Sequence, residues 1–438
     1  MQISDPAPSA SSPVSALSVT EQRVLDAVDA AFEATVAHIQ AAVRRPSVTG
    51  EEGVVQDVMA NLLRDLDMTV DVWEPQHADF AAHPEFVAEE PPFVGRPNVV
   101  GVWKGTGGGR SLAVNGHIDV VPAGDEAAWR TPPFDATRAD GRIYGRGAVD
   151  MKGGLVAAIG ALGAVQAAGV RLRGDAMVQC VIGEESGGVG TLATILRGHV
   201  ADGVLIPEPT GLALSPAQGG CLMFRITVSG RSAHAAMRTE GESALEHWYP
   251  LHRALLDLEA ERNRTLSHPL FHQPNIVPFN VGRLETGNWP SSVPDTLVAS
   301  GRFGVLPGEA METVRAAFER TLFDAAARDP WLRDHPPALE WYGAQFGTAE
   351  IAPTHPLVET VRGAFVAAVG HEPAVEGVTW GSDMRLFTEI AGAPAILFGP
   401  GDVRWAHYAN EYIEESELRT AMRVDALTFL RWCRVAEE

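Results

Sequence analysis

The chain has 438 residues, of which 45% are hydrophobic and 21% charged, and its formal net charge is −22. Its length predicts two or three domains, and its composition is typical of a folded globular protein. The acidic balance argues against nucleic acid and anionic membranes as partners, because both require clustered basic side chains. No stretch has the roughly 18 consecutive apolar residues of a membrane span.

The first segment, residues 1–18, is rich in Ser, Pro and Ala and predicts a disordered tail. It has neither the basic nor the apolar region of a secretory signal. The chain has 3 cysteines, which lie far apart and favour a reducing compartment. We therefore expect a cytoplasmic protein without a disulfide framework.

The predicted elements up to about residue 210 alternate between helix and strand. The capping-box residues Ser18–Glu21 precede a helix over 19–44, and Thr49–Glu52 predicts the start of a second helix. We interpret 98–104 and 112–121 as neighbouring strands. This alternation indicates an α/β domain with a mostly parallel sheet. The other predicted strands are 69–73, 176–182 and 203–206, and the other predicted helices are 151–168 and 192–196.

The order of predicted elements changes at about residue 220 to strand, helix, strand, strand, helix, strand. That order matches a ferredoxin-like α+β domain. After about residue 350, two helices and a strand at 395–398 return to the α/β pattern. We therefore predict a catalytic domain formed by residues 19–219 and 348–438, with an inserted domain at 220–347.

Polar residues follow several of the predicted strands. His117 and Asp119 are two apart, so in an extended segment both face the same side. Asp150 stands at a turn beside two glycines. This pair of features alone fits a metal site, but it fits equally well a loop histidine and a helix N-cap.

Later residues extend the set of candidate metal ligands. Two histidines with several carboxylates suit zinc, cobalt or manganese, and their number fits two metal ions that share one carboxylate. Neighbouring side chains diverge on an extended chain, so Glu184 and Glu185 should differ in role, one binding metal and the other acting as general base. The further candidates are Glu184, Glu185, Glu208 and His407.

The chain resembles the co-catalytic zinc amidohydrolases from about residue 25 onward. This family includes acetylornithine deacetylase, succinyl-diaminopimelate desuccinylase, aminoacylase and the glutamate carboxypeptidases. The resemblance lies in five motifs in order, GHIDVVP, GRGAVDMKGG, GEES, PEPT and AHYANEY, at 116–122, 145–154, 183–186, 207–210 and 406–412.

The resemblance implies a role for each candidate residue. Asp150 matches the ligand that bridges two metal ions, and its peptide bond to Met151 is expected to be cis. Asp119 matches the carboxylate that orients His117, and Glu184 matches the general base that activates a bridging water. The ligands would be His117 and Glu208 for one metal ion, and Glu185 and His407 for the other.

The resemblance also extends to the inserted domain. His234 matches a histidine that reaches the partner subunit's site and stabilises the oxyanion, which implies a homodimer formed through this domain. Arg302 matches an arginine that grips a substrate carboxylate. The alternatives are a turn histidine and a charge on a strand surface. We assign further substrate contacts to Asp383, Arg385, Gly399 and Gly401.

One position departs from the family's pattern. Relatives usually carry an Asn shortly before the strand that holds the arginine, and here Ser291–Pro294 occupies that place. This difference puts one substrate contact in doubt.

The expected function is hydrolysis of an amide bond in a small N-acyl amino acid or a related N-acyl or N-formyl amine. The expected cofactors are two divalent metal ions, zinc first, with cobalt and manganese as alternatives. The loop at 75–95 and the residues after it most resemble proteins like acetylornithine deacetylase and formylaminopyrimidine deformylase. Alternatives are a dipeptidase or carboxypeptidase of the same family and a catalytically silent metal-binding relative. A two-metal phosphoesterase would require a basic phosphate clamp, which we do not find.

Overall fold

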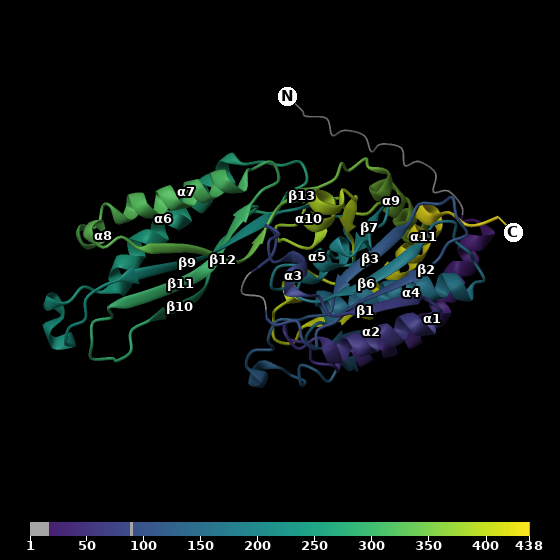
Figure 1. Cartoon of the computed structure of the whole chain (residues 1–438), viewed down its shortest axis with the longest axis horizontal. Coiled ribbons are helices and arrows are strands. Elements are labelled where there is room, and N and C mark those ends of the chain that lie inside the picture. Colours follow the sequence, from purple (N-terminus) through teal and green to yellow (C-terminus); the bar gives the residue numbers. More distant parts are fainter. Residues whose placement is uncertain (1–16, 88–90, 438) are drawn as a thin grey trace, which may run out of the picture.

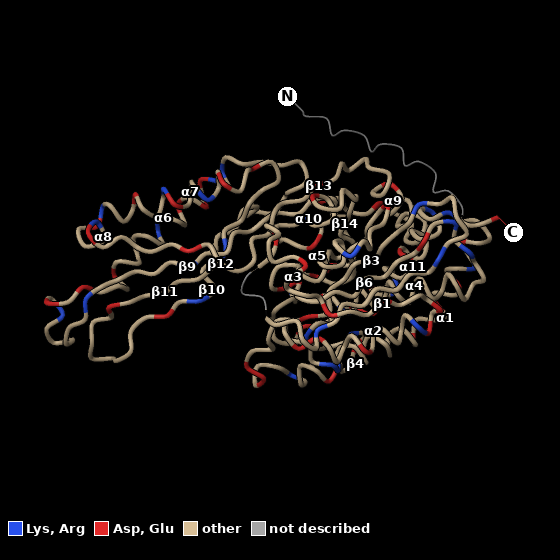
Figure 2. Tube along the Cα trace, viewed as in Figure 1, with Lys and Arg blue, Asp and Glu red and all other residues tan. Residues whose placement is uncertain are grey.

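The computed structural model describes residues 17–87 and 91–437. Two lobes lie along its long axis, one around a six-stranded sheet and the other around a four-stranded sheet (Figure 1). The tail predicted at 1–18 lies outside the described residues apart from Leu17 and Ser18. Ser18 caps the first helix in the predicted capping box with Glu21. Basic residues are scattered among acidic ones in both lobes (Figure 2).

The six-stranded sheet has the order β1-β2-β6-β3-β7-β14. The last four strands run parallel, and β1 and β2 pair antiparallel at one edge. The prediction of a mixed α/β fold with a parallel sheet is confirmed. The strands are β1 (Thr69–Trp73), β2 (Asn98–Trp103), β3 (Leu112–His117), β6 (Ala176–Val181), β7 (Val204–Ile206) and β14 (Ala395–Leu397).

The prediction that 98–104 and 112–121 are neighbouring strands is wrong. Strand β6 lies between β2 and β3, antiparallel to the first and parallel to the second. The connection that follows β2 crosses the chain segment leading into β6, where the amides of Thr106 and Gly107 donate to the carbonyls of Leu172 and Arg173. Sequence order therefore did not give spatial order here.

Helices pack around this sheet, and the strongly apolar helix α4 lies between two others. Helix α4 contacts both α1 and α11, and a side chain at Gly160 would collide with Thr35 of α1 at 2.4 Å. The segment Ala148–Ala167 is long and apolar enough to cross a membrane, but 83% of its apolar window is buried, as in a core helix. The helices are α1 (Val19–Val43), α2 (Gly53–Asp65), α4 (Gly153–Ala167), α5 (Val189–Leu196), α9 (Pro356–Val369) and α11 (Glu415–Cys433).

The predicted capping box at Thr49–Glu52 is wrong. Helix α2 begins after Glu52, and no side chain caps its first turn. Both predicted partners are engaged elsewhere. The hydroxyl of Thr49 donates to the Asp119 carboxylate at 3.0 Å, and Glu52 forms a buried ion pair with Arg96. Tertiary contacts have therefore replaced the local cap.

The four-stranded sheet is antiparallel, in the order β10-β11-β9-β12. Two long helices cover one of its faces (Figure 1), where alternate residues of β9, from Leu222 to Val228, are buried. The chain order is strand, helix, strand, strand, helix, strand, as predicted. The elements are β9 (Gly220–Ser229), α6 (Ala244–Thr265), β10 (Phe279–Thr286), β11 (Thr296–Val305), α7 (Met311–Ala326) and β12 (Ala338–Phe346).

Short elements connect the two lobes and support the loops. Strands β8 and β13 pair where the chain enters and leaves the smaller lobe. Strands β4, β5 and β15 form a three-stranded sheet that joins chain segments far apart in sequence. These elements are β8 (Ala217–Gln218), β13 (Ala349–Glu350), β4 (Thr137–Ala139), β5 (Arg142–Tyr144) and β15 (Tyr412–Glu414), with short helices α3 (His77–Phe80), α8 (Pro330–Asp334) and α10 (Met384–Leu386). Short helical turns lie at Glu126–Ala128, Phe387–Ala391 and Val403–Trp405. The turns at Ala148–Lys152 and Ala235–Glu240 are interrupted by non-helical backbone, at Asp150 and Met151 in the first and at Met237 in the second.

Candidate metal centre and substrate cavity

The candidate ligands gather at the carboxyl ends of three neighbouring parallel strands. His117 is the last residue of β3, Glu184 and Glu185 follow β6, and Glu208 follows β7. Open α/β sheets bind their ligands at this edge. The parallel strands therefore bring His117 and Glu208 to the same edge although they are 91 positions apart in sequence.

Asp150 lies between the two predicted histidine ligands. Its Oδ1 is 3.2 Å from His117 Nε2, and its Oδ2 is 3.4 Å from His407 Nε2. One carboxylate thus offers a separate oxygen to each imidazole, a position from which it could be shared by two metal ions. The peptide bond from Asp150 to Met151 is cis, as the resemblance implied.

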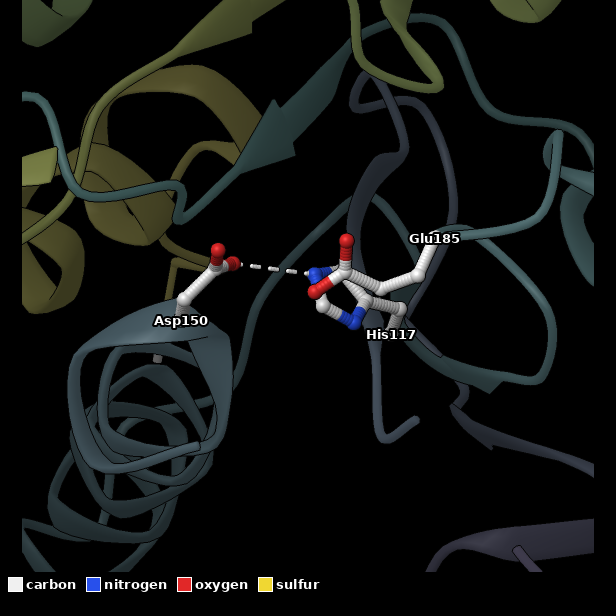
Figure 3. A group of neighbouring side chains, drawn as sticks. All are labelled: His117, Asp150 and Glu185. Atoms are coloured by element: carbon white, nitrogen blue, oxygen red, sulfur yellow. Dashed lines mark hydrogen bonds and ion pairs between the residues drawn. The ribbon is translucent and has the colours of Figure 1, made fainter. Parts of the chain in front are cut away.

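Glu185 completes a compact group of donors with His117 and Asp150 (Figure 3). One ligand atom from each of the three lies within 4.8 Å of the others. Glu185 Oε1 is also 3.2 Å from His407 Nε2, so Glu185 lies on the His407 side. Glu208 is buried and lines the same cavity. Histidine nitrogens and carboxylate oxygens without cysteine fit a divalent metal of the zinc type.

Asp119 supports the site from behind. The His117 Nδ1 atom lies 2.9 Å from the backbone carbonyl of Asp119, which fixes the ring orientation. The two carboxylate oxygens of Asp119 accept the backbone amides of Glu184 and Glu185, each at 3.2 Å. Asp119 therefore connects one imidazole ligand to the turn that carries the predicted base.

The cluster of carboxylates is electrostatically unfavourable by itself. Burial and the neighbouring Asp150 charge raise the pKa of Glu208 to about 8. Burial also raises the pKa of Glu184 well above its usual range, with Asp383 and Glu208 adding to the effect. Burial works in the same direction on Asp150, but hydrogen bonds from His117 and His407 outweigh it and lower the pKa of that carboxyl. Divalent cations would offset this repulsion, so the residues fit the metal ions that the sequence implied.

A buried ion pair that we did not predict holds the backbone of the bridging ligand. Glu411 accepts the amides of Val149 and Asp150 at 3.0 and 3.3 Å, and its other oxygen is 2.5 Å from Arg146 Nη1. Burial raises the pKa of Glu411 to about 7 despite Arg146. Both residues are contained in the motifs already singled out, with Glu411 four positions after His407, but spacing alone gave them no role.

Arg146 also ties the ligand-bearing loops to one another. Its guanidinium donates to the carbonyl of Tyr408, next to His407, at 3.5 Å, and to that of Pro122 at 3.3 Å. Strand β15, just past His407, pairs with β5, just before Asp150. The segments that carry three of the predicted ligands are therefore fastened together around one buried pair.

A cavity of about 600 Å³ opens over this cluster. At one end it is lined by the predicted base and ligands, including Glu184 and His407. At the other end its walls are mostly apolar and come largely from the four-stranded sheet. These walls comprise Val87, Cys221, Met223, Ala344, Phe346 and Trp380, with Arg302 beside them.

The predicted substrate contacts fall into two groups. Arg302 lines the cavity and donates from Nη2 to the Thr379 carbonyl at 3.3 Å. Asp383 and Arg385 are buried behind the Glu184–Gly188 turn, where Arg385 Nη2 donates to the Gly187 carbonyl at 2.8 Å. Neither residue lines the main cavity.

The remaining predicted residues also lie outside the cavity lining. A side chain at Gly399 would meet the carbonyls of Pro207 and Glu208 at 2.5 Å, and one at Gly401 would meet Val149 at 2.2 Å. These glycines let their loop approach the ligand backbone closely. His234 is exposed on the smaller lobe, where its Nδ1 accepts the amide of Ala236.

A group of imidazole and carboxylate donors beside a cavity is typical of a metal-dependent hydrolase, and comparison with known proteins gives the family. Residues 113–431 match the model of peptidase family M20/M25/M40. The chain belongs to this family, so the predicted resemblance and the predicted class, an amide-bond hydrolase, are confirmed.

Two of the similar curated proteins are named as a deformylase and a deacetylase. The chain is 34% identical over 360 residues to N-formyl-4-amino-5-aminomethyl-2-methylpyrimidine deformylase of Halalkalibacterium halodurans, covering 77% of this chain and 83% of the relative. It is 33% identical over 346 residues to acetylornithine deacetylase of Myxococcus xanthus, covering 78% and 85%.

Solved structures share the fold at lower identity. The Dug1p dipeptidase of Saccharomyces cerevisiae superposes with a TM-score of 0.77 and 14% identity, covering 96% of this chain and 100% of that one. Human carnosine dipeptidase 1 gives a TM-score of 0.72 and 18% identity, covering 94% and 100%. These likenesses support the two-lobed fold.

Proposed function

We propose that the protein is a two-metal amidohydrolase that removes a small acyl group, such as formyl or acetyl, from an N-acylated amine or amino acid. The observation that carries this proposal is the position of Asp150, which presents one oxygen to His117 and the other to His407. The names of the two curated relatives, a deformylase and a deacetylase, support the reaction class.

Five side chains would hold the metal ions. His117 and Glu208 would bind one ion and Glu185 and His407 the other, with Asp150 between them. Zinc is the metal we propose, because the donors are imidazole and carboxylate in a hydrolytic site. When bound, the ions supply Lewis acidity that polarises the amide carbonyl and acidifies a water molecule.

Glu184 is the residue that we propose moves the proton. Its carboxylate lines the cavity beside the ligands and has no metal-ligand role in this assignment. It takes a proton from the attacking water and delivers that proton to the nitrogen of the leaving amine, after which the C–N bond breaks. Arg302 would bind a carboxylate or another acceptor on the substrate through its planar fork.

We also propose that the smaller lobe, residues 220–347, is a ferredoxin-like insert in a catalytic domain of residues 19–219 and 348–438. Its sheet order β10-β11-β9-β12 and its chain order support this assignment. The exposed position of His234, away from the cavity of its own chain, suits a homodimer in which it serves the partner's site. Light scattering of the purified protein measures that dimer directly. A cytoplasmic location is proposed from the three free, buried cysteines.

The proposal is tested by metal analysis together with a substrate panel. The metal-free protein, prepared by chelation, should be inactive and should recover with about two equivalents of zinc, cobalt or manganese per chain. The panel contains N-formyl and N-acetyl amines, N-acetyl amino acids, dipeptides and a phosphoester. Full activity in excess chelator would refute the metal site, and activity confined to dipeptides or to the phosphoester would refute the deacylase.

A further inference from the structure

The open face of the four-stranded sheet carries an unusual cluster at the end nearest the candidate metal centre. Helices α6 and α7 cover the other face, so side chains on the open face need not be apolar. Cys221, Ala344 and Phe346 nevertheless form a separate buried apolar cluster, against which Met223 packs. All four line the main cavity.

The strand register explains why these residues act as one surface. Cys221 and Met223 are two apart on β9 and so point to the same side, as do Ala344 and Phe346 on β12. Cys221 pairs with Phe346 across the two strands, and Met223 pairs with Arg302 across β9 and β11. Side chains of paired residues lie on the same face of a sheet.

Farther along the same open face the character changes from apolar to charged. A neighbouring hollow of about 420 Å³ is lined by Arg225, Arg283 and Glu285, among others. Arg225 pairs there with Glu340, and Arg283 pairs with Glu285. The apolar cluster is therefore local to the part of the sheet that faces the candidate metal centre.

Packing between the lobes accounts for only part of the cluster. The Arg385 guanidinium stacks on the Phe346 ring at 4.4 Å, and Gly381 lies against the same ring, so Phe346 has a structural role. Met223 and Trp380, by contrast, are only half-buried while lining the cavity. Their accessible apolar surface is available to a bound molecule.

We propose that Met223 and Trp380, supported by Cys221 and Phe346, select substrates whose amine portion carries an uncharged apolar group. The pairing of Met223 with Arg302 places this surface on the side where Arg302 would hold the substrate's acceptor, which belongs to the amine portion of an N-acyl amino acid. This inference rests on the proposed deacylase function and specifies its substrate class.

The same geometry disfavours a substrate with a cationic side chain. Among the described residues that line the cavity, the carboxylates are Asp150, Glu184, Glu185 and Glu208, all in the candidate catalytic cluster. Inside this cavity, an ammonium group against Met223 would lose its water, meet no carboxylate outside the catalytic cluster and lie beside the Arg302 charge.

A pair of substrates that match in length tests this proposal. N-acetyl-L-norleucine and N-acetyl-L-ornithine differ in a terminal methyl versus a terminal ammonium. With the zinc-loaded enzyme we expect kcat/KM to favour norleucine by about 10- to 100-fold, the range that such pocket differences give. N-acetyl-L-phenylalanine should be accepted as well as N-acetyl-L-norleucine, because the half-buried Trp380 offers an aromatic face.

Substitutions of Met223 test whether this apolar surface causes the preference for the uncharged substrate. Met223→Ser should lower kcat/KM for norleucine by about 10-fold and leave that for ornithine nearly unchanged, whereas the volume-conserving Met223→Leu should keep the wild-type preference. Val298→Ser, on the open face but outside the main cavity, controls for general effects on the sheet.

Three outcomes separate the possible failures. Hydrolysis of both substrates with equal kcat/KM, or an equal loss for both in Met223→Ser, would overturn the specificity proposal while leaving the deacylase intact. Hydrolysis that favours ornithine would overturn it also. No hydrolysis of any N-acyl compound by the metal-loaded enzyme would instead overturn the proposed function on which it rests.

Discussion

The two sheets that meet at the cavity present opposite kinds of surface to it. The six-stranded sheet contributes buried charge, because the residues at its carboxyl edge include His117, Glu184 and Glu208. Apart from Arg302, the four-stranded sheet contributes neutral apolar surface around Met223 and Phe346. The first surface is unfavourable without cations, whereas the second needs only to exclude water.

We expect the charged edge to carry out the reaction and the apolar face to select the substrate. A change at the charged edge should affect every substrate alike, through proton transfer or metal retention. A change on the apolar face should affect the ranking of substrates and leave the metal ions in place. The predictions below would break or sharpen that division.

The largest effect is expected from Glu184→Gln. The amide has nearly the same shape as the carboxylate but cannot accept the proton from water, so kcat should fall by about 100- to 10,000-fold for all substrates. Metal content, measured by mass spectrometry of the intact metal-loaded protein, should stay at the wild-type level.

The metal measurement decides how the Glu184 variant is interpreted. If the variant loses metal in proportion to its activity, Glu184 is a ligand and the general base must be another residue. If only some substrates are affected, the division between the two surfaces is wrong.

A smaller effect is expected from Glu411→Gln. The variant loses the ion pair with Arg146 that holds the Glu411 side chain where it accepts the amides of Val149 and Asp150. We therefore expect metal affinity to fall by about 10- to 100-fold, as for other residues that orient ligands. Competition with a chromogenic zinc chelator measures this affinity without an activity assay. The preference for norleucine over ornithine should be unchanged.

A second buried pair provides the matched control for Glu411. Glu52 pairs with Arg96 in an equally buried setting, but its carboxylate accepts no amide from a predicted ligand residue. Glu52→Gln should therefore lower stability without a comparable loss of zinc affinity. Equal losses of affinity in both variants would show that Glu411 acts through general stability rather than through positioning.

Much of the carboxyl edge of the six-stranded sheet, where the candidate ligands lie, was predictable because it depends on periodicity and motif order. Strands such as 112–121 and 176–182 were predicted to within a few residues, and the polar residues after them met at one edge because parallel strands share their direction. What the sequence did not give was the order of strands in space. Strand β6 lies between β2 and β3, and the loop contacts near Gly107 and Arg173 that accompany this order have no periodic signal in the sequence.

Supporting residues were harder to predict than ligands. Thr49 has a local capping pattern but bonds instead to Asp119, 70 positions away. Asp383 and Arg385 belong to a motif associated with substrate, yet their side chains lie behind the turn that carries Glu184. In each case the competing partner comes from a distant part of the chain, so only the folded structure shows which contact wins.

The smallest effect concerns a buried carboxylate that has no role at either surface. Asp425 is buried in α11, and among the described residues its Oδ1 atom has no hydrogen-bond partner. Burial raises its pKa well above the ordinary value of 3.8, so between that value and the folded pKa the native state binds the extra proton and stability falls as pH rises. Asp425→Asn replaces the titrating carboxyl with an amide, so the free energy of unfolding of the variant relative to wild type should improve between pH 5 and pH 8 by about 1 kcal/mol or more.

Urea unfolding at equal metal loading measures the change, with the exposed Asp57→Asn as control. If Asp425→Asn shows the same pH dependence as wild type, burial alone does not make a carboxylate unfavourable in this core, and the argument that the ligand cluster requires cations would lose its physical basis.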